Sequence, residues 1–383
     1  MAALAGMIRG RVPHAILLVG PTGVGKTTLA LDLAAGLLCG APEPADRPCG
    51  ACRACRLVRS DGHPDVHRLG PEGAGRQVVI GGPGARARGV RDLLSELALL
   101  PVEGGARVAL IESADRMNED AQAAILKTLE EPPAGIVLIL CADAEEPILP
   151  TIRSRCARLR LGPVATRDVE AMLTELGAAD APLAARLARI TGGRPGLALA
   201  WARDPDALLV RDEVVRTLLD LVHARPAERI SGVRAAVAGA ARLQPLAGPS
   251  TAPAASTAVP TRVTDAAQAT AGDTADDPDT GSSIGSARTP ATERRRAAEA
   301  LIAVWVDLAR DIALCQRGLA ADVREVGLLD ETTAAAGRIT RNDITSFLER
   351  LGRAAVLVRS NVSPDLVVDD LAVHWPGGDV AAA

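Results

Sequence analysis

The segment Gly20-Pro-Thr-Gly-Val-Gly-Lys-Thr27 has the spacing of a phosphate-binding P-loop. Its glycines let the backbone bend so that successive N–H groups surround phosphate oxygens, and a following helix adds positive potential. In that chemistry Lys26 reaches the β- and γ-phosphates and Thr27 holds Mg²⁺. The alternative is a glycine-rich turn without a ligand. The predicted ATP-binding residues are Gly20, Pro21, Thr22, Gly23, Val24, Gly25, Lys26, Thr27 and Thr28.

Four cysteines, Cys39, Cys49, Cys52 and Cys55, fall within seventeen residues. In a reducing compartment this density favours metal ligands over disulfides. Four thiolates suit a structural zinc ion, which closes tetrahedrally and fastens a loop without a core of its own. An iron-sulfur cluster and unligated thiols are the alternatives. The other three cysteines are expected to be packing residues.

The segment Ile111-Glu-Ser-Ala-Asp115 follows a short apolar run and offers a second nucleotide-site element. P-loop ATPases place a carboxylate there for Mg²⁺, commonly beside a glutamate that polarises water. Glu112 could take the metal-side position, but the hydroxyl of Ser113 is too weakly basic to act as the base. The pattern predicts binding without efficient hydrolysis. Alternatively, Glu112 and Asp115 are only polar residues at a strand end.

Two arginines, Arg153 and Arg155, lie in Pro150-Thr-Ile-Arg-Ser-Arg-Cys156, which we expect to form a loop before a fourth strand. Their spacing alone predicts a solvated basic loop.

Composition narrows the classes of protein. The 383 residues carry a net charge of -4 and only 1% aromatic residues, which disfavours a free-standing nucleic-acid binder. No apolar run is long enough for a membrane span, and the N-terminus lacks the features of a secretory signal. We therefore expect a cytoplasmic protein of two or three domains without membrane contact.

The apolar patterns predict an α/β domain followed by helices. Nearly continuous apolar runs at 15–20, 108–111 and 136–141, with an alternating run at 157–161, indicate strands of a parallel sheet. Helices are expected at 27–38 and after Asn118, a suitable N-cap. These features predict an α/β domain over 1–161, and only helical patterns follow. Residues 244–293 lack large apolar side chains and are expected to be a disordered linker.

Taken together, the P-loop, the four-cysteine insert, Leu126-Lys-Thr-Leu-Glu-Glu-Pro-Pro133 and Ser154-Arg-Cys156 resemble the clamp-loader ATPases of the bacterial replicative polymerase. The resemblance covers about residues 11–205, and Asn361-Val-Ser-Pro-Asp-Leu366 is similar to the family's last collar helix. It implies a P-loop AAA+ domain over 1–161 with the zinc insert at 39–55, a helical lid over 162–203, and a helical collar over 204–243 and 294–383.

The same resemblance implies partners and a role for one arginine. The family forms a hetero-pentamer of gamma/tau and delta subunits with a further member, and it acts on the sliding clamp and primed DNA. The arginine of Ser-Arg-Cys points at a neighbour's ATP, which assigns Arg155 as an arginine finger acting in trans. Such an arginine stabilises the charge of the transferring phosphoryl group.

Departures from the family pattern favour a supporting member over a motor. Ser113 stands where the motor subunit has glutamate, and Pro195 stands where its lid has arginine. Arg194, one residue early, is the remaining candidate in the lid for nucleotide contact. The segment before the P-loop strand is shorter than in the family, so from the resemblance we expect weaker nucleotide binding. We expect a polymerase holoenzyme subunit with weak or absent ATP hydrolysis of its own. The alternatives are a competent gamma/tau-type ATPase and a zinc-bearing, non-enzymatic scaffold with a vestigial P-loop.

Overall fold

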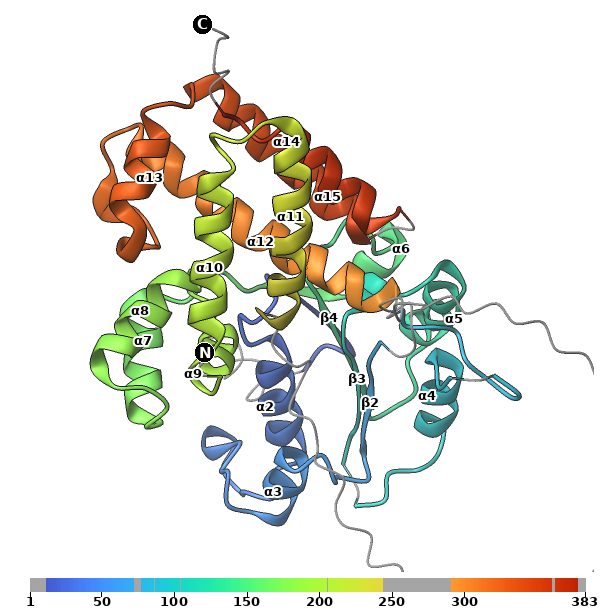
Figure 1. The fold of residues 1–383 in the computed structure, drawn as a ribbon. Helices are drawn as coiled ribbons and strands as arrows, with labels where there is room; N and C mark the ends of the chain where they lie inside the picture. Colours follow the sequence, from blue (N-terminus) through green and yellow to red (C-terminus); the bar gives the residue numbers. More distant parts are fainter. Residues whose placement is uncertain are drawn as a thin grey trace, which may run out of the picture.

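The computed structural model describes residues 12–71, 77–85, 87–103, 105–204, 206–243, 291–359 and 362–377. Its centre is a five-stranded sheet in the order β2-β3-β4-β1-β5, in which every neighbouring pair is parallel (Figure 1). The strands are β1 Ala15–Val19, β2 Val66–Leu69, β3 Arg107–Ile111, β4 Ile136–Ala142 and β5 Ala157–Arg160. The predicted α/β fold with a parallel sheet is confirmed.

The three inner strands β1, β3 and β4 are buried along their whole length because helices cover both faces of the sheet. One face packs against α2 (Lys26–Leu38) and α3 (Arg53–Arg59), and the other against α4 (Val90–Leu97) and α5 (Glu119–Glu130). Burial on both faces explains why the apolar runs are continuous. The predicted N-cap of α5 is confirmed, since the Asn118 side chain accepts a hydrogen bond from the backbone N–H of Ala121.

Two elements differ from expectation. Strand β2 was not predicted, because Val66-His-Arg-Leu lies at the edge of the sheet and only its last residue is fully buried. The segment expected to be a loop at 150–156 begins with a short helix, α6 (Pro150–Arg153), for which Pro150 supplies the first helical residue. Because β2 adds a strand that the sequence does not predict, the strand after α6 is fifth in chain order and not fourth.

Three helices follow the sheet and share a small core of their own. They are α7 (Thr166–Glu175), α8 (Ala181–Ile190) and α9 (Pro195–Ala202). Val169, Leu187 and Trp201 are among its buried residues. We use the name lid for these three helices.

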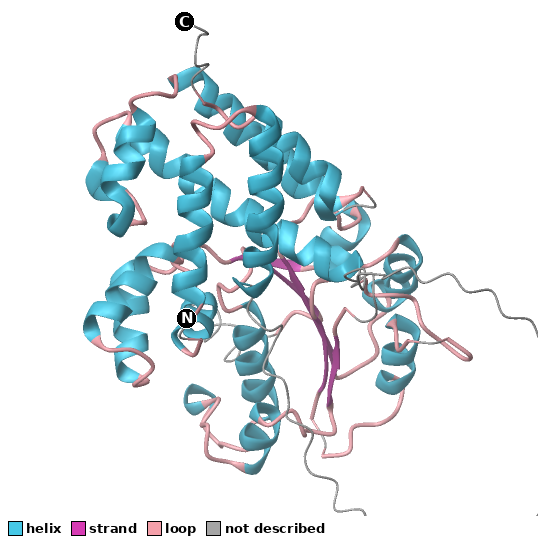
Figure 2. Cartoon of the chain, viewed as in Figure 1, coloured by secondary structure: helices cyan, strands magenta, loops and turns pink. Residues whose placement is uncertain are grey.

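The remaining helices lie together in a bundle (Figure 2) and share a core larger than that of the lid. They are α10 (Ala207–Asp220), α11 (Pro226–Ala240), α12 (Ala291–Cys315), α13 (Leu329–Ala336), α14 (Arg341–Arg359) and α15 (Pro364–Val373). Trp305 lies at its centre, with ring centroids 5.4 Å from Phe347 and 5.3 Å from Trp375. We use the name collar for these helices. Short 3-10 turns complete the described chain at Pro44–Asp46, Ala114–Arg116, Ala241–Leu243, Ala320–Asp322 and Val326–Leu328.

The predicted disordered linker, 244–293, lies mostly outside the described residues, which omit 244–290. The prediction is wrong for its last three residues, 291–293, which are helical because α12 begins at Ala291 and not at Arg294. Ala291 and the charged residues that follow have good helix propensity, so the first turn extends the helix backwards. None of the helices in the described ranges combines the length and apolarity needed to cross a bilayer.

Candidate functional site

The P-loop connects β1 to α2, in the position that the sequence predicts. Gly23 and Gly25 have φ angles of 83° and 103°, in the left-handed region that favours glycine. The Nζ of Lys26 donates to the carbonyl oxygens of Gly20 at 2.7 Å and Pro21 at 3.2 Å. The lysine side chain therefore folds back over the loop, beside the N-terminus of α2, where phosphate binding would require it. Thr27 and Thr28 form the first turn of α2.

Asp143 is a P-loop contact that sequence reasoning missed. It follows the last residue of β4, and its Oδ1 accepts from the Nζ of Lys26 at 2.7 Å while its Oδ2 accepts from the hydroxyl of Thr22 at 2.7 Å. Burial raises the pKa of Asp143, but the charge and hydrogen bond of Lys26, the hydrogen bond of Thr22 and the charge of Arg359 together hold the pKa below its ordinary value. The available signal was a carboxylate directly after a buried strand, on the strand that pairs with β1.

Glu112 follows β3 but has an arginine partner. Its Oε1 accepts from the Nη2 of Arg68 at 2.6 Å, and Arg68 also forms an ion pair with Asp61 at 2.9 Å. None of the described hydrogen bonds of Glu112 reaches the P-loop. Binding Mg²⁺ through Glu112 therefore requires loss or rearrangement of the Arg68 pair. Ser113, at the position where a base is needed, has a φ of 54°.

The lid contacts the P-loop at Gly23. The backbone N–H of Gly196, near the start of α9, donates to the carbonyl oxygen of Gly23 at 2.8 Å. A Cβ on Gly196 would lie 3.0 Å from that oxygen, so the approach depends on glycine. Arg194 immediately precedes α9, but its Nε donates to the carbonyl of Thr191 at 2.7 Å.

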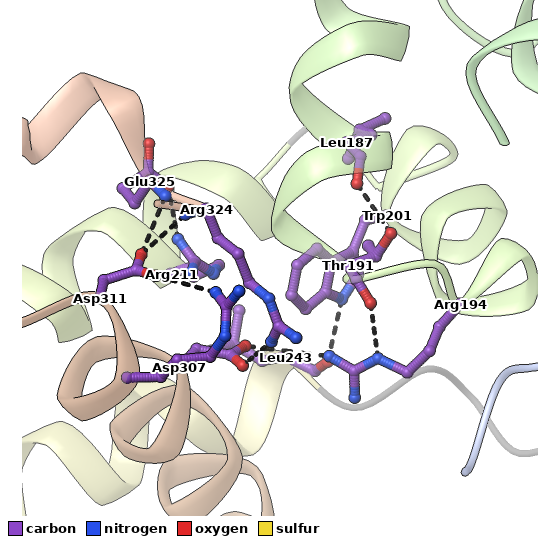
Figure 3. Close-up of polar contacts among 11 residues, drawn as sticks. Leu187, Thr191, Arg194, Trp201, Arg211, Leu243, Asp307, Asp311, Arg324 and Glu325 are labelled. Carbon is purple, nitrogen blue, oxygen red and sulfur yellow. Dashed lines mark hydrogen bonds and ion pairs between the residues drawn. The ribbon is translucent and has the colours of Figure 1, made fainter. Parts of the chain in front are cut away.

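The guanidinium of Arg194 is directed toward the collar, with Nη2 3.9 Å from Asp307 on α12 (Figure 3). Burial lowers the pKa of Arg194, and the carboxylate of Asp307 partly opposes that effect. Of the two residues proposed for Mg²⁺ or nucleotide contact, Glu112 and Arg194, each therefore has a protein partner.

A charged network beside Arg194 ties lid and collar together (Figure 3). Arg324 forms an ion pair with Asp307, and Arg211 forms one with Glu325. The Oδ2 of Asp311 accepts from the backbone N–H groups of Arg324 at 3.0 Å and Glu325 at 3.1 Å. Arg186 of the lid adds a contact of 3.3 Å to Glu325. The network joins α8, α10 and α12 through the segment between α12 and α13, which carries Arg324 and Glu325.

Arg155 lies between α6 and β5, with its side chain 36% exposed. Its Nη2 is 2.8 Å from Oε1 of Glu130 at the end of α5, and its Nη1 donates to the carbonyl of Thr151 at 2.9 Å. Because both carboxylate and guanidinium are partly exposed to solvent, this ion pair contributes little to stability. The arginine can therefore exchange partners at low cost.

The four predicted metal ligands come together. The sulfur atoms of Cys39, Cys49, Cys52 and Cys55 all lie within 4.8 Å of one another, and those of Cys39 and Cys52 are 3.9 Å apart. A tetrahedral zinc site with Zn–S bonds of about 2.3 Å has sulfur–sulfur edges of about 3.8 Å. Backbone N–H groups of Cys49, Cys52 and Cys55 each donate to a cysteine sulfur at 3.4 Å. The donor set and its spacing fit a metal ion.

The thiols of this cluster differ in acidity. The backbone N–H of Cys55 is the largest cause that lowers the pKa of Cys52, to about 6. Burial is the largest cause that raises the pKa of Cys55. A metal ion deprotonates a coordinating thiol outright, so a bound ion would offset the burial of Cys55.

Part of this chain is similar to proteins named as subunits of DNA polymerase III. Residues 4–165 match the family model described as DNA polymerase III, delta subunit. The protein called DNA polymerase III subunit delta' from Pseudomonas aeruginosa is 38% identical over 188 residues, which are 49% of this chain and 55% of that protein. The protein of the same name from Escherichia coli K12 is 36% identical over 192 residues, 50% of this chain and 55% of that protein.

A relative with a different subunit name matches over a shorter stretch. DNA polymerase III subunit tau from Salmonella typhimurium is 36% identical over 162 residues, 42% of this chain and 24% of that protein. The chain spans about half the length of the delta' relatives described above.

Proposed function

We infer that this chain, whose residues 4–165 match the family model described as DNA polymerase III, delta subunit, is the delta-prime subunit of a bacterial clamp loader. In this role it joins gamma/tau and delta subunits in a hetero-pentamer that loads the sliding clamp onto primed DNA in the cytoplasm. The observation that carries the proposal is the match of the P-loop domain to proteins named delta'. The Glu112-Ser113 pair supports it, because Ser113 cannot serve as the base of an efficient ATPase.

Arg155 is the residue through which the chain acts on a neighbour's ATP. Its planar guanidinium suits the charge that spreads over a transferring phosphoryl group. Its only ion pair in the described chain is the partly exposed one with Glu130, so moving to a stronger anion costs little. We assign Arg155 as an arginine finger in trans.

The cysteine cluster holds a structural zinc ion, and the P-loop binds ATP with Mg²⁺ weakly. Cys39, Cys49, Cys52 and Cys55 would supply four thiolates, a closed set that leaves no position for substrate. Lys26 would contact the phosphates and Thr27 the Mg²⁺ ion. A bound zinc ion would cross-link the insert at 39–55. The insert needs such a link because it contributes few residues to the neighbouring core.

Reconstitution of the pentamer tests the proposal. We expect assemblies with Arg155→Ala to lose the contribution of one site to the DNA-stimulated ATPase, since an arginine finger accelerates its site by about 10³-fold or more. Arg158→Ala is the matched control, because it removes an exposed arginine from the adjacent strand β5. Unchanged turnover with Arg155→Ala rejects the finger. Failure of the wild-type chain to enter the pentamer rejects membership.

A gamma/tau-type ATPase is the second candidate, favoured by the complete P-loop and the position of Lys26. The isolated chain would then hydrolyse ATP, and Lys26→Ala would abolish the activity. Absence of turnover by the wild-type chain, measured at saturating ATP, removes this candidate.

A further inference from the structure

All three hydrogen-bond donors of the Lys26 ammonium are engaged. Two are directed to the carbonyl oxygens of Gly20 and Pro21, and the third to Oδ1 of Asp143 at 2.7 Å. An ammonium has no fourth donor. Any phosphate oxygen that accepts from Lys26 must therefore compete with a protein acceptor, and Asp143 is the one that carries a negative charge.

The second oxygen of Asp143 fixes where the carboxylate lies along the loop. It accepts from the hydroxyl of Thr22, four residues before Lys26 and in the first half of the loop. The N–H groups that cradle the inner phosphates belong to the last residues of the loop and the start of α2. The carboxylate thus lies at the outer end of the loop, beyond the inner phosphates, where Lys26 would meet a terminal phosphate.

We propose that Asp143 acts as a specificity-determining residue that makes this P-loop prefer a nucleoside diphosphate to a nucleoside triphosphate. The inference rests on the proposed nucleotide site. A diphosphate brings only its β-phosphate to Lys26, so fewer oxygens compete with Asp143 for the ammonium. A triphosphate brings further negative charge beside a carboxylate whose side chain is only 21% exposed, where repulsion is less screened than in bulk water.

Neighbouring contacts keep the carboxylate in this position. The backbone N–H of Asp143 donates to Oδ1 of Asp115 at 3.2 Å, so the chain after β4 is also held by the turn that follows β3. On the loop side, Gly23, directly after Thr22, is held by the hydrogen bond from Gly196 of the lid. The acceptor of Lys26 and Thr22 is therefore built into two elements of the fold and is not a loose surface side chain.

Equilibrium binding of fluorescent ADP and ATP analogues, with Mg²⁺ present, tests the inference on the full chain. We expect the wild-type chain to bind the diphosphate more tightly. Asp143→Asn keeps the shape of the side chain and removes its charge, and we expect it to strengthen triphosphate binding about tenfold. Asp143→Ser provides a second uncharged variant, and Asp168→Asn, an exposed carboxylate on α7, is the matched control. Thermal unfolding shows which variants are folded.

The outcomes separate the two proposals. Equal wild-type affinity for both nucleotides, with binding lost in Lys26→Ala, overturns the preference and keeps the nucleotide site. An unchanged or weaker triphosphate affinity in both folded Asp143 variants also overturns the role of Asp143. No binding of either nucleotide by the wild-type chain or the variants rejects the nucleotide site and this inference together.

Discussion

Neutralising Glu325 should destabilise the chain strongly, because this carboxylate compensates a buried arginine. The side chains of Arg211 and Glu325 are 2% and 5% exposed, and Arg186 is also 3.3 Å from the carboxylate. Glu325→Gln keeps the size of the side chain but leaves the Arg211 charge without its ion-pair partner. Breaking a buried pair in this way costs about 3–5 kcal/mol.

That loss is large against the total stability of a domain, about 5–15 kcal/mol. The midpoint of thermal unfolding shifts by about 2–4 °C per kcal/mol for a unit of this size, so it should fall by about 6–20 °C. Tryptophan fluorescence during heating is the assay, since Trp305 and Trp375 lie in the collar core. Glu349→Gln, on the exposed face of α14, is the control and should shift the midpoint little.

A double variant separates the cost of an unpaired charge from a packing defect. Arg211→Met with Glu325→Met removes both charges, and replacing a buried pair by apolar side chains is often neutral. We therefore expect the double variant to recover most of the loss. If Glu325→Gln unfolds within about 2 °C of the Glu349→Gln control, the Arg211 charge does not depend on Glu325 and the reasoning is wrong.

Three further predictions concern the metal cluster, the P-loop and the collar core. Cys52→Ser should reduce bound zinc, measured by elemental analysis, from one ion per chain to a small fraction; full occupancy would contradict four-thiolate ligation. The pKa of Asp143 lies below its ordinary value of 3.8, so its stabilisation is complete above about pH 4 and disappears as the pH falls through the lowered pKa. Urea unfolding should accordingly show Asp143→Asn to be less stable than wild type at neutral pH, with the difference shrinking in acid; a difference that grows in acid has the wrong sign. Trp305→Ala should lower the free energy of unfolding by about 3–5 kcal/mol in the same assay. A loss below about 1 kcal/mol would mean that the aromatic cluster around this fully buried residue can collapse without penalty.

Sequence patterns predict the elements whose environment is uniform along the chain. The inner strands β1, β3 and β4 are buried on both faces, so their apolar runs are unbroken, and the cap of α5 is encoded by adjacent residues. Edge strand β2 has no such signal because most of its side chains are only half-buried. The cysteine spacing likewise predicts a convergent cluster, which the structure confirms; zinc itself stays a prediction.

The interactions that define the candidate site are less accessible to sequence reasoning. Asp143 meets Lys26 across 117 residues because β4 and β1 are neighbours in the sheet. Arg194 similarly meets Asp307 through packing of the lid on the collar. Motifs record which residues lie close in sequence, whereas these partners depend on strand order and helix packing. The P-loop could therefore be located from its sequence, but not the carboxylate that contacts it.

The most direct test of the proposed role is the position of Arg155 in the assembled pentamer on primed DNA, determined by electron cryomicroscopy with a γ-phosphate analogue. We predict that its guanidinium leaves Glu130 and lies within hydrogen-bond distance of the analogue in the neighbouring subunit. An Arg155 side chain that stays on Glu130, or turns to solvent away from any nucleotide, contradicts action in trans.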